Sequence, residues 1–241
     1  MRILIANDDG VGAAQLPNLI RWCQQYGEVT TVVPKVEQSG KSHGIELHRD
    51  LEAKEVELEP GIKVWTVDST PADCVRFAVI GLGQTFDLVI SGVNRGLNVG
   101  VDLIYSGTVG AASEAVNLGM KAVALSTTPG NYENATKHLG QVMEFFKVHD
   151  LLSIHNLYNV NIPADPKGIR ITRMGGPYFS DDFVPVGNDL YRPTGKVLWK
   201  DTGDDTLDTD AVLRGKYISI TPLIVDRTDH KLFGNLSKLN P

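Results

Sequence analysis

Short apolar segments alternate with amphipathic stretches along the first two thirds of the chain. The apolar segments are rich in branched residues and end in turn residues, which indicates buried strands. They are Ile3–Ala6, Val29–Val33, Val64–Val67, Leu88–Ile90 and Ala122–Leu125. Alternation of strands and helices predicts an α/β fold, namely a three-layer, Rossmann-like, mostly parallel sheet with helices on both faces.

Four helices are predicted between and after these strands. In the first, Leu16, Leu19, Ile20 and Cys23 recur at the three-and-four spacing of an amphipathic helix. The second has a clear start at Thr70, because a hydroxyl cap is followed by a proline and, in the first turn, an acid. The third and fourth are expected over Val109–Gly119 and Leu139–Phe146.

Two segments depart from this pattern. Polar and apolar residues alternate over Ile45–Glu59, which suggests a hairpin excursion, and helical periodicity vanishes over Gly175–Gly203, where prolines, glycines and aromatics mix. The second segment is interpreted as an extended arm whose aromatics form a partner surface or pack on their own core. A short helix is expected over Asp208–Leu213 and a strand over Tyr217–Thr221. We therefore divide the chain into an α/β core (1–175), an oligomerisation arm (176–206) and a C-terminal return to the core (207–241).

Composition excludes several classes of protein. The 241 residues include 23 basic and 29 acidic side chains, a formal net charge of −6, which argues against a general nucleic-acid-binding surface. Two cysteines cannot form a disulfide framework or a four-cysteine zinc site. No apolar stretch approaches a membrane span, and the first residues do not resemble a signal peptide. We expect a reduced, cytoplasmic protein without a membrane or nucleic-acid partner.

Candidate chemistry begins directly after the first strand, at Asn7-Asp8-Asp9-Gly10. Ligands bind outside the carboxyl ends of strands in open α/β sheets. Two adjacent carboxylates repel each other unless a cation lies beside them, and Mg²⁺ or Mn²⁺ accepts such oxygen ligands. A surface turn is the alternative. A haloacid-dehalogenase site is disfavoured, because there the two acids are separated by one residue.

A second polar loop, Glu37–Gly44, follows the second strand. It contains Gly-Lys-Ser, but a phosphate-binding P-loop would require glycine where Lys35 stands, so we reject that reading. Ser39 is a neutral oxygen ligand or phosphate donor in the functional interpretation, with Lys41 or His43 near the anion; a plain flexible loop is the alternative. No Gly-x-Ser-x-Gly sequence surrounds Ser39, which disfavours a covalent nucleophile.

A third loop, Ser91–Gly100, carries three glycines together with Asn94 and Asn98. It leads through Tyr105 to Ser106-Gly107-Thr108 at a predicted helix start, where free N–H groups and the helix dipole favour an anion. Simple capping by Ser106 is the alternative. Because parallel strands end at one edge of the sheet, the three loops are expected to converge on one pocket suited to phosphate ester hydrolysis.

Five motifs stand out along the chain: ILIANDDG, EQSG at Glu37–Gly40, TPADCV at Thr70–Val75, SGVNRGLNVG and YSGTVGAASEA. Together they resemble the survival protein E family of metal-dependent nucleotidases. The resemblance implies one divalent ion held by Asp8, Asp9, Ser39 and Asn94. We hypothesise that Asp8 and Asp9 are the catalytic residues, because they anchor the ion and one of them accepts the proton of the attacking water. The resemblance also implies phosphate binding around Asn94, Ser106, Gly107 and Thr108, and a homodimer or homotetramer joined through an exchanged C-terminal arm.

The chain departs from the family pattern at Val11–Gln15, where a proline–glycine step is usual, and at Lys41–Gly44. We hypothesise hydrolysis of nucleoside 5′-monophosphates, with 3′-monophosphates as further substrates, by a metal-activated water and without a covalent intermediate. A non-catalytic nucleotide or metabolite sensor on the same fold is one alternative. A structural oligomer built around the arm is another.

Overall fold

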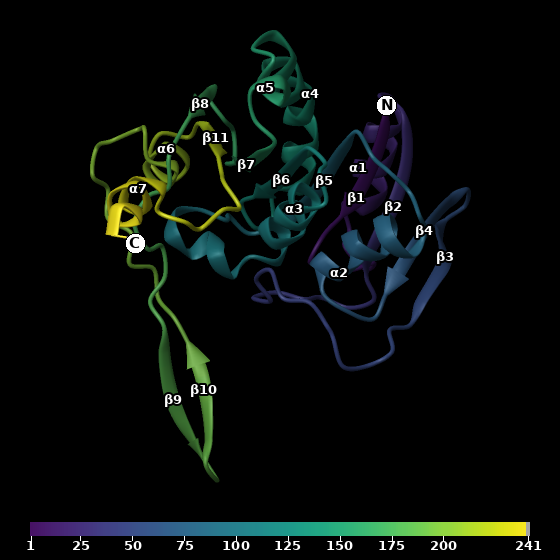
Figure 1. Cartoon of the computed structure of the whole chain (residues 1–241), viewed down its shortest axis with the longest axis horizontal. Coiled ribbons are helices and arrows are strands. Elements are labelled where there is room, and N and C mark those ends of the chain that lie inside the picture. The colour runs from purple at the N-terminus through teal and green to yellow at the C-terminus, as the bar shows by residue number, and fades with distance from the viewer. Residues whose placement is uncertain (240–241) are drawn as a thin grey trace.

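The computed structural model describes residues 1–239 and is built on one large central sheet (Figure 1). Nine strands form it in the order β3-β4-β2-β1-β5-β6-β7-β11-β8. Their bounds are β1 Arg2–Ala6, β2 Glu28–Pro34, β3 Ala53–Glu59, β4 Ile62–Val67, β5 Leu88–Arg95, β6 Ala122–Thr127, β7 Leu157–Ile162, β8 Ile169–Ile171 and β11 Ile218–Pro222. The neighbours from β4 to β7 are all parallel, which confirms the predicted α/β class.

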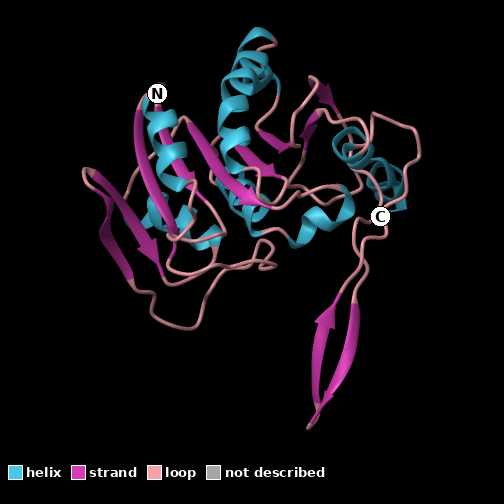
Figure 2. Cartoon of the chain, turned by 180° about the vertical axis from the view of Figure 1, so that it is seen from behind, coloured by secondary structure: helices cyan, strands magenta, loops and turns pink. Residues whose placement is uncertain are grey.

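Helices cover both faces of the sheet (Figure 2). They are α1 Leu16–Gln24, α2 Pro71–Arg76, α3 Gly107–Asn117, α4 Tyr132–Val148, α5 Leu151–Ile154, α6 Asp208–Leu213 and α7 His230–Leu236, with a π-helical turn η1 Phe77–Gly81 and the 3-10 turns η2 Gly100–Tyr105 and η3 Ser237–Leu239. None of these helices is long and apolar enough to cross a membrane.

Strand β1 shows how one sequence supplies two cores. Successive side chains of a strand point to opposite faces. Ile3 and Ile5 accordingly pack with α1 and α4 on one face. Leu4 and Ala6 pack with α2 and α3 on the other face. Burial on both faces explains why this strand is an uninterrupted apolar run rather than an alternating one.

The predicted start of the second helix is confirmed in detail. The Thr70 side chain caps α2 by accepting a hydrogen bond from the Asp73 backbone N–H at 3.1 Å, and Pro71 occupies the first turn. The fourth predicted helix is longer than its apolar pattern indicated, because α4 begins at Tyr132. Its first turn lies beside the carboxyl-end loops of the sheet.

The hairpin expected over Ile45–Glu59 is confirmed only for the second half of that segment. Ala53–Glu59 forms β3, which pairs antiparallel with β4 at the sheet edge. The preceding residues form no strand, because the Glu46 carboxylate accepts the backbone N–H groups of Leu47 and His48, both at 2.9 Å. A side chain that bonds its own backbone in this way competes with strand pairing.

The last third of the chain divides between the sheet and a projecting hairpin. Strand β11, expected over Tyr217–Thr221 and found one residue later, pairs antiparallel with β7, a strand that the sequence pattern missed. Between them, β9 Asp182–Gly187 and β10 Leu190–Thr194 form a two-stranded hairpin that extends away from the body (Figure 1). Every residue of these two strands is exposed.

Candidate functional site

A cavity of about 490 Å³ lies where β1 and β5 end and α3 begins. Asp8, Ser39, Asn94 and Ser106 all line it. Asp8 and Ser39 come from loops and Ser106 from a helix start, whereas Asn94 lies near the end of β5, which extends to Arg95 into the segment that the sequence predicts as a loop. The convergence expected from parallel strands is therefore present, and it places hydroxyl, amide and carboxylate oxygens around one space.

Asp8 follows β1 and is almost fully buried. Its Oδ1 accepts a hydrogen bond from Thr108 Oγ1 at 2.5 Å, and its backbone carbonyl accepts one from the Gln38 N–H at 2.7 Å. Burial raises the pKa of Asp8 to about 6; the Thr108 hydrogen bond opposes this rise and the neighbouring charge of Asp9 adds to it. A carboxylate held here benefits from a cation.

Asp9 is half-buried and does not line the cavity wall. Its Oδ2 accepts hydrogen bonds from the Arg95 backbone N–H at 3.1 Å and from Gln15 Nε2 at 3.3 Å. Burial raises the pKa of Asp9, while the amide and the charge of Arg95 work in the opposite direction. The two acids are thus held from different sides, Asp8 by α3 and Asp9 by the end of β5.

Ser39 and Asn94 supply the neutral oxygens at the cavity. Ser39 is exposed, and its hydroxyl donates to Glu37 Oε1 at 2.7 Å. The Asn94 Nδ2 donates to the Gly96 carbonyl at 2.8 Å. The amide oxygen, Oδ1, is on the opposite side of the planar amide group. Both residues line the cavity that Asp8 lines.

The start of α3 divides its predicted roles among three residues. Ser106 caps the helix by accepting from the Val109 N–H at 3.2 Å, and it also lines the cavity. Gly107 packs so closely on Asp8 that an added Cβ would lie 3.0 Å from the Asp8 Cβ. Thr108 is fully buried and reaches Asp8 instead of the cavity. The sequence predicts that all three residues bind phosphate. In the structure, the Thr108 hydroxyl instead donates to the Asp8 carboxylate.

Sequence reasoning missed the residues that support these loops. Gln15 joins the site by donating both to Asp9 and, at 2.5 Å, to the Val93 carbonyl. Asn159 and Asn161 on β7 are fully buried and donate to the Asn98 carbonyl at 2.8 and 2.9 Å. The signal for the asparagines was available, since two amides alternating in an otherwise apolar strand need polar partners.

His43, considered as a residue near the anion, lies elsewhere. Its Nε2 is 2.7 Å from Glu114 Oε2 on α3, and Arg76 Nη1 donates to the other Glu114 oxygen at 3.0 Å. His43 lines a larger neighbouring cavity of about 1070 Å³, which shares Tyr105 and Ser106 with the first. It fastens the Ser39 loop to α3.

The donor set fits a hard divalent cation. Asp8 shares the cavity with a serine hydroxyl and an asparagine amide, and Asp9 follows it directly in the chain. Both carboxyl groups have raised pKa values, and oxygen ligands of this kind suit Mg²⁺ or Mn²⁺. Among residues 1–239, no three His, Cys, Asp or Glu side chains gather as a metal cluster.

The fold and the site define a class: an α/β protein with a doubly covered parallel sheet and an acidic pocket at its strand ends. The sequence model of the family described as Survival protein SurE matches residues 3–181, and the chain belongs to this family. It is 39% identical to the 5′-nucleotidase SurE of Pelotomaculum thermopropionicum, covering 99% of this chain and 95% of that one.

Two further relatives extend the comparison. The 5′-nucleotidase SurE of Gemmatimonas aurantiaca is 42% identical, over 95% of this chain and 94% of its own. The crystal structure of the SurE protein from Aquifex aeolicus superposes with a TM-score of 0.79 at 28% identity, covering 99% of both chains. The similarity therefore includes the C-terminal third as well as the core.

Proposed function

We propose that this protein is a metal-dependent 5′-nucleotidase that hydrolyses nucleoside 5′-monophosphates to nucleoside and phosphate. The observation that carries the proposal is the cavity shared by Asp8, Ser39, Asn94 and Ser106 at the strand ends. Full-length relatives named 5′-nucleotidase SurE support it. Nucleoside 3′-monophosphates are proposed as a second substrate class for the same site.

Asp8, Asp9, Ser39 and Asn94 would hold one divalent ion, Mg²⁺ or Mn²⁺. When bound, this ion supplies Lewis-acid assistance and neutralises phosphate charge. The protein's own part is positional. Thr108 fixes one Asp8 oxygen, and the Arg95 amide with Gln15 fixes one Asp9 oxygen. Such fixed orientation keeps the reacting groups in place without reorganisation.

The start of α3 binds the phosphate in this proposal. Ser106 lies at the cavity and Gly107 brings the first helical turn against Asp8. A helix N-terminus stabilises negative charge through its N–H groups and dipole. The carboxylates of Asp8 and Asp9 provide the acceptor for the proton that the attacking water releases. Displacement is direct, with no group on the protein becoming phosphorylated.

The proposal is tested by measuring phosphate release from a panel of nucleoside 5′- and 3′-monophosphates with Mn²⁺, with Mg²⁺ and with chelator. Metal-dependent release that chelator abolishes is the expected result. A folded sample that releases no phosphate with either metal would contradict the proposal and favour a nucleotide-binding protein. Comparing the 5′ and 3′ series in the same assay assigns the position of the ester.

We further propose that the segment 176–206 is an oligomerisation arm on a core of residues 1–175, with residues 207–241 returning to that core. The hairpin β9–β10 exposes Phe183, Val184, Leu190 and Tyr191, an unusual set of apolar side chains for a surface. Exchange between copies would bury them in a homodimer or homotetramer. Light scattering on the purified chain tests this, and a monomer at micromolar concentration would contradict it.

A cytoplasmic location is also proposed. Cys23 and Cys74 are free and buried, which is what a reducing compartment permits. Fractionation of cells expressing the chain tests this location, and recovery in an oxidising compartment would contradict it.

A further inference from the structure

Two aromatic rings stand exposed at the rim of the candidate site. Tyr105, at the end of η2, and Phe179, at the root of the arm, are 55% and 48% exposed. Both line the cavity that contains Asp8 and Ser106. Packing within the chain does not explain two aromatic residues beside a polar, acidic cavity, because about half of each residue stays exposed.

The root of the arm is held firmly at its outgoing end. The Asp102 Oδ2 accepts the backbone N–H groups of both Tyr178 and Phe179 at 2.8 Å. The Tyr178 and Phe179 rings also pack against each other, with centroids 4.3 Å apart. Asp208 joins the two flanking segments, accepting from the Gly175 N–H at 2.8 Å and from the Gly100 N–H at 3.0 Å. Phe179 is therefore positioned before any ligand arrives.

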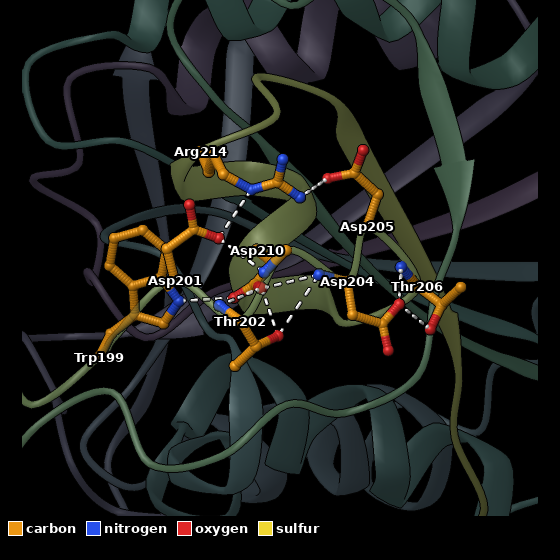
Figure 3. Close-up of polar contacts among 9 residues, drawn as sticks. Trp199, Asp201, Thr202, Asp204, Asp205, Thr206, Asp210 and Arg214 are labelled. Carbon is orange, nitrogen blue, oxygen red and sulfur yellow. Dashed lines mark hydrogen bonds and ion pairs between the residues drawn. The ribbon is translucent and has the colours of Figure 1, made fainter.

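The returning end is fastened as well (Figure 3). Asp210 accepts hydrogen bonds from Trp199 Nε1 at 2.8 Å and from the Thr202 hydroxyl at 2.6 Å. Arg214 bonds Asp201 and Asp205 on either side of it, at 2.8 and 2.5 Å. A ring held on a preorganised frame loses little conformational entropy when it binds a ligand.

The charged groups that line the cavity favour one orientation of a phosphate monoester. Asp102 and Asp181 line the cavity near the arm, whereas Asp8, Arg95 and Ser106 line it toward the ends of the strands and the N-terminus of α3. Carboxylates repel an anion, and a guanidinium and a helix N-terminus attract one. Under the proposed function, the divalent ion at Asp8 offsets the charge of that carboxylate. A phosphate monoester would therefore place its anionic end at α3 and its uncharged remainder toward Phe179.

We propose that Phe179, with Tyr105 beside it, forms a nucleobase subsite at the root of the arm. This inference rests on the proposed function, since it names the part of the substrate that the arm would recognise. Stacking on an aromatic ring tolerates every base, because each base has a π-face. The subsite therefore gives broad base tolerance, with purines favoured over pyrimidines by their larger stacking surface.

The test compares a nucleotide with the same ester lacking a base. In Phe179→Ala, kcat/KM for adenosine 5′-monophosphate is expected to fall about tenfold or more, mainly through KM, while kcat/KM for ribose 5-phosphate changes less than about twofold. Phe179→Trp is expected to restore the nucleotide value. Phe183→Ala is the matched control, because Phe183 is the same residue type on the arm but outside the cavity.

Calorimetry measures the binding of adenosine 5′-monophosphate and of ribose 5-phosphate to the metal-loaded protein. It separates the nucleobase subsite from the proposed nucleotidase activity, because binding does not depend on hydrolysis. Base-dependent affinity that Phe179→Ala removes supports the subsite, whether or not phosphate is released. Equal loss for both ligands, or no loss for either, overturns it. Light scattering on each variant shows whether assembly has changed, and a loss shared by Phe183→Ala would assign the effect to assembly and overturn the subsite.

Discussion

Asp8 and Thr108 are polar side chains that lie buried at the edge of the sheet, whereas Phe183 and Tyr191 are apolar side chains that lie more than 60% exposed on the arm. Both arrangements cost free energy in an isolated chain. Burial of a carboxylate carries a desolvation penalty, which the raised pKa of Asp8 expresses. Exposure of large apolar surface leaves hydrophobic stabilisation unused.

The buried acids and the exposed arm therefore suit binding partners of different chemistry. Under the proposed function, the buried acids bind a cation, and the cation allows an anionic substrate to bind beside them. The arm calls for apolar surface, because its strands pair with each other and with nothing else among the described residues. We expect substitutions at the buried acids to change phosphate release and substitutions on the arm to change assembly.

The largest effect is expected from Asp8→Asn. Loss of one carboxylate should lower the rate of phosphate release about 10²-fold or more, on the scale of several kcal/mol for metal assistance. Far-ultraviolet circular dichroism should be unchanged, since Asn can still accept the Thr108 hydrogen bond. Asp50→Asn on the exposed surface is the control. An active Asp8→Asn protein would remove Asp8 from the mechanism.

The next contrast concerns stability. Leu139 on α4 is fully buried, so Leu139→Ala should lower the free energy of unfolding by about 2–5 kcal/mol. Phe183→Ala should change the unfolding free energy of the monomer by less than about 0.5 kcal/mol while shifting the oligomer distribution. Urea unfolding and light scattering measure the two effects. Similar destabilisation by both variants would mean that the arm packs on the body.

A smaller effect is expected at Gly107. In Gly107→Ala the new Cβ would lie 3.0 Å from both the Asp8 Cβ and the Pro71 Cγ, which displaces the carboxylate. We expect about a tenfold loss in kcat/KM. Gly140→Ala on α4 is the matched control, because no atom lies within 4 Å of its added Cβ, and it should stabilise the helix by about 0.5–1 kcal/mol. Full activity in Gly107→Ala would mean that Asp8 tolerates displacement.

The smallest effect concerns the contact between the Ser39 loop and α3. The hydrogen bond from His43 holds the pKa of Glu114 below its usual range, with the hydrogen bond from Arg76 adding to this. A lowered folded-state pKa stabilises the protein above the ordinary Glu pKa, and this stability is lost as pH falls through the folded value. Glu114→Gln should cost about 1 kcal/mol at pH 7. The cost should shrink below pH 4.5, the ordinary value. A pH-independent difference in thermal unfolding would contradict this.

Much of the fold followed from local patterns. All five apolar runs became parallel neighbours of the sheet, and the Thr70 cap starts α2 as expected. Strand β7 escaped notice because its two buried asparagines interrupt the apolar pattern. The hairpin begins later than expected, because the Glu46 carboxylate bonds the backbone N–H groups of Leu47 and His48, which no periodicity reveals.

The candidate site was predictable to the level of its loops. Adjacent acids, a hydroxyl loop and a glycine-rich loop after three parallel strands had to meet at one edge, and Asp8, Ser39, Asn94 and Ser106 do so. Which residue touches which was not predictable. Gln15 reaches Asp9 from six positions along the chain, and nothing in its neighbourhood marks it as polar support.

The sequence by itself determined most elements of the parallel core, the family and the edge of the sheet where chemistry belongs, because helix caps and strand periodicity are local properties. Only the tertiary structure decided that Thr108 supports Asp8 and that Phe179 stands at the site. The first contact joins residues 100 positions apart. Such contacts depend on how α3 and the arm root pack against the ends of the sheet, and packing is a property of the whole chain.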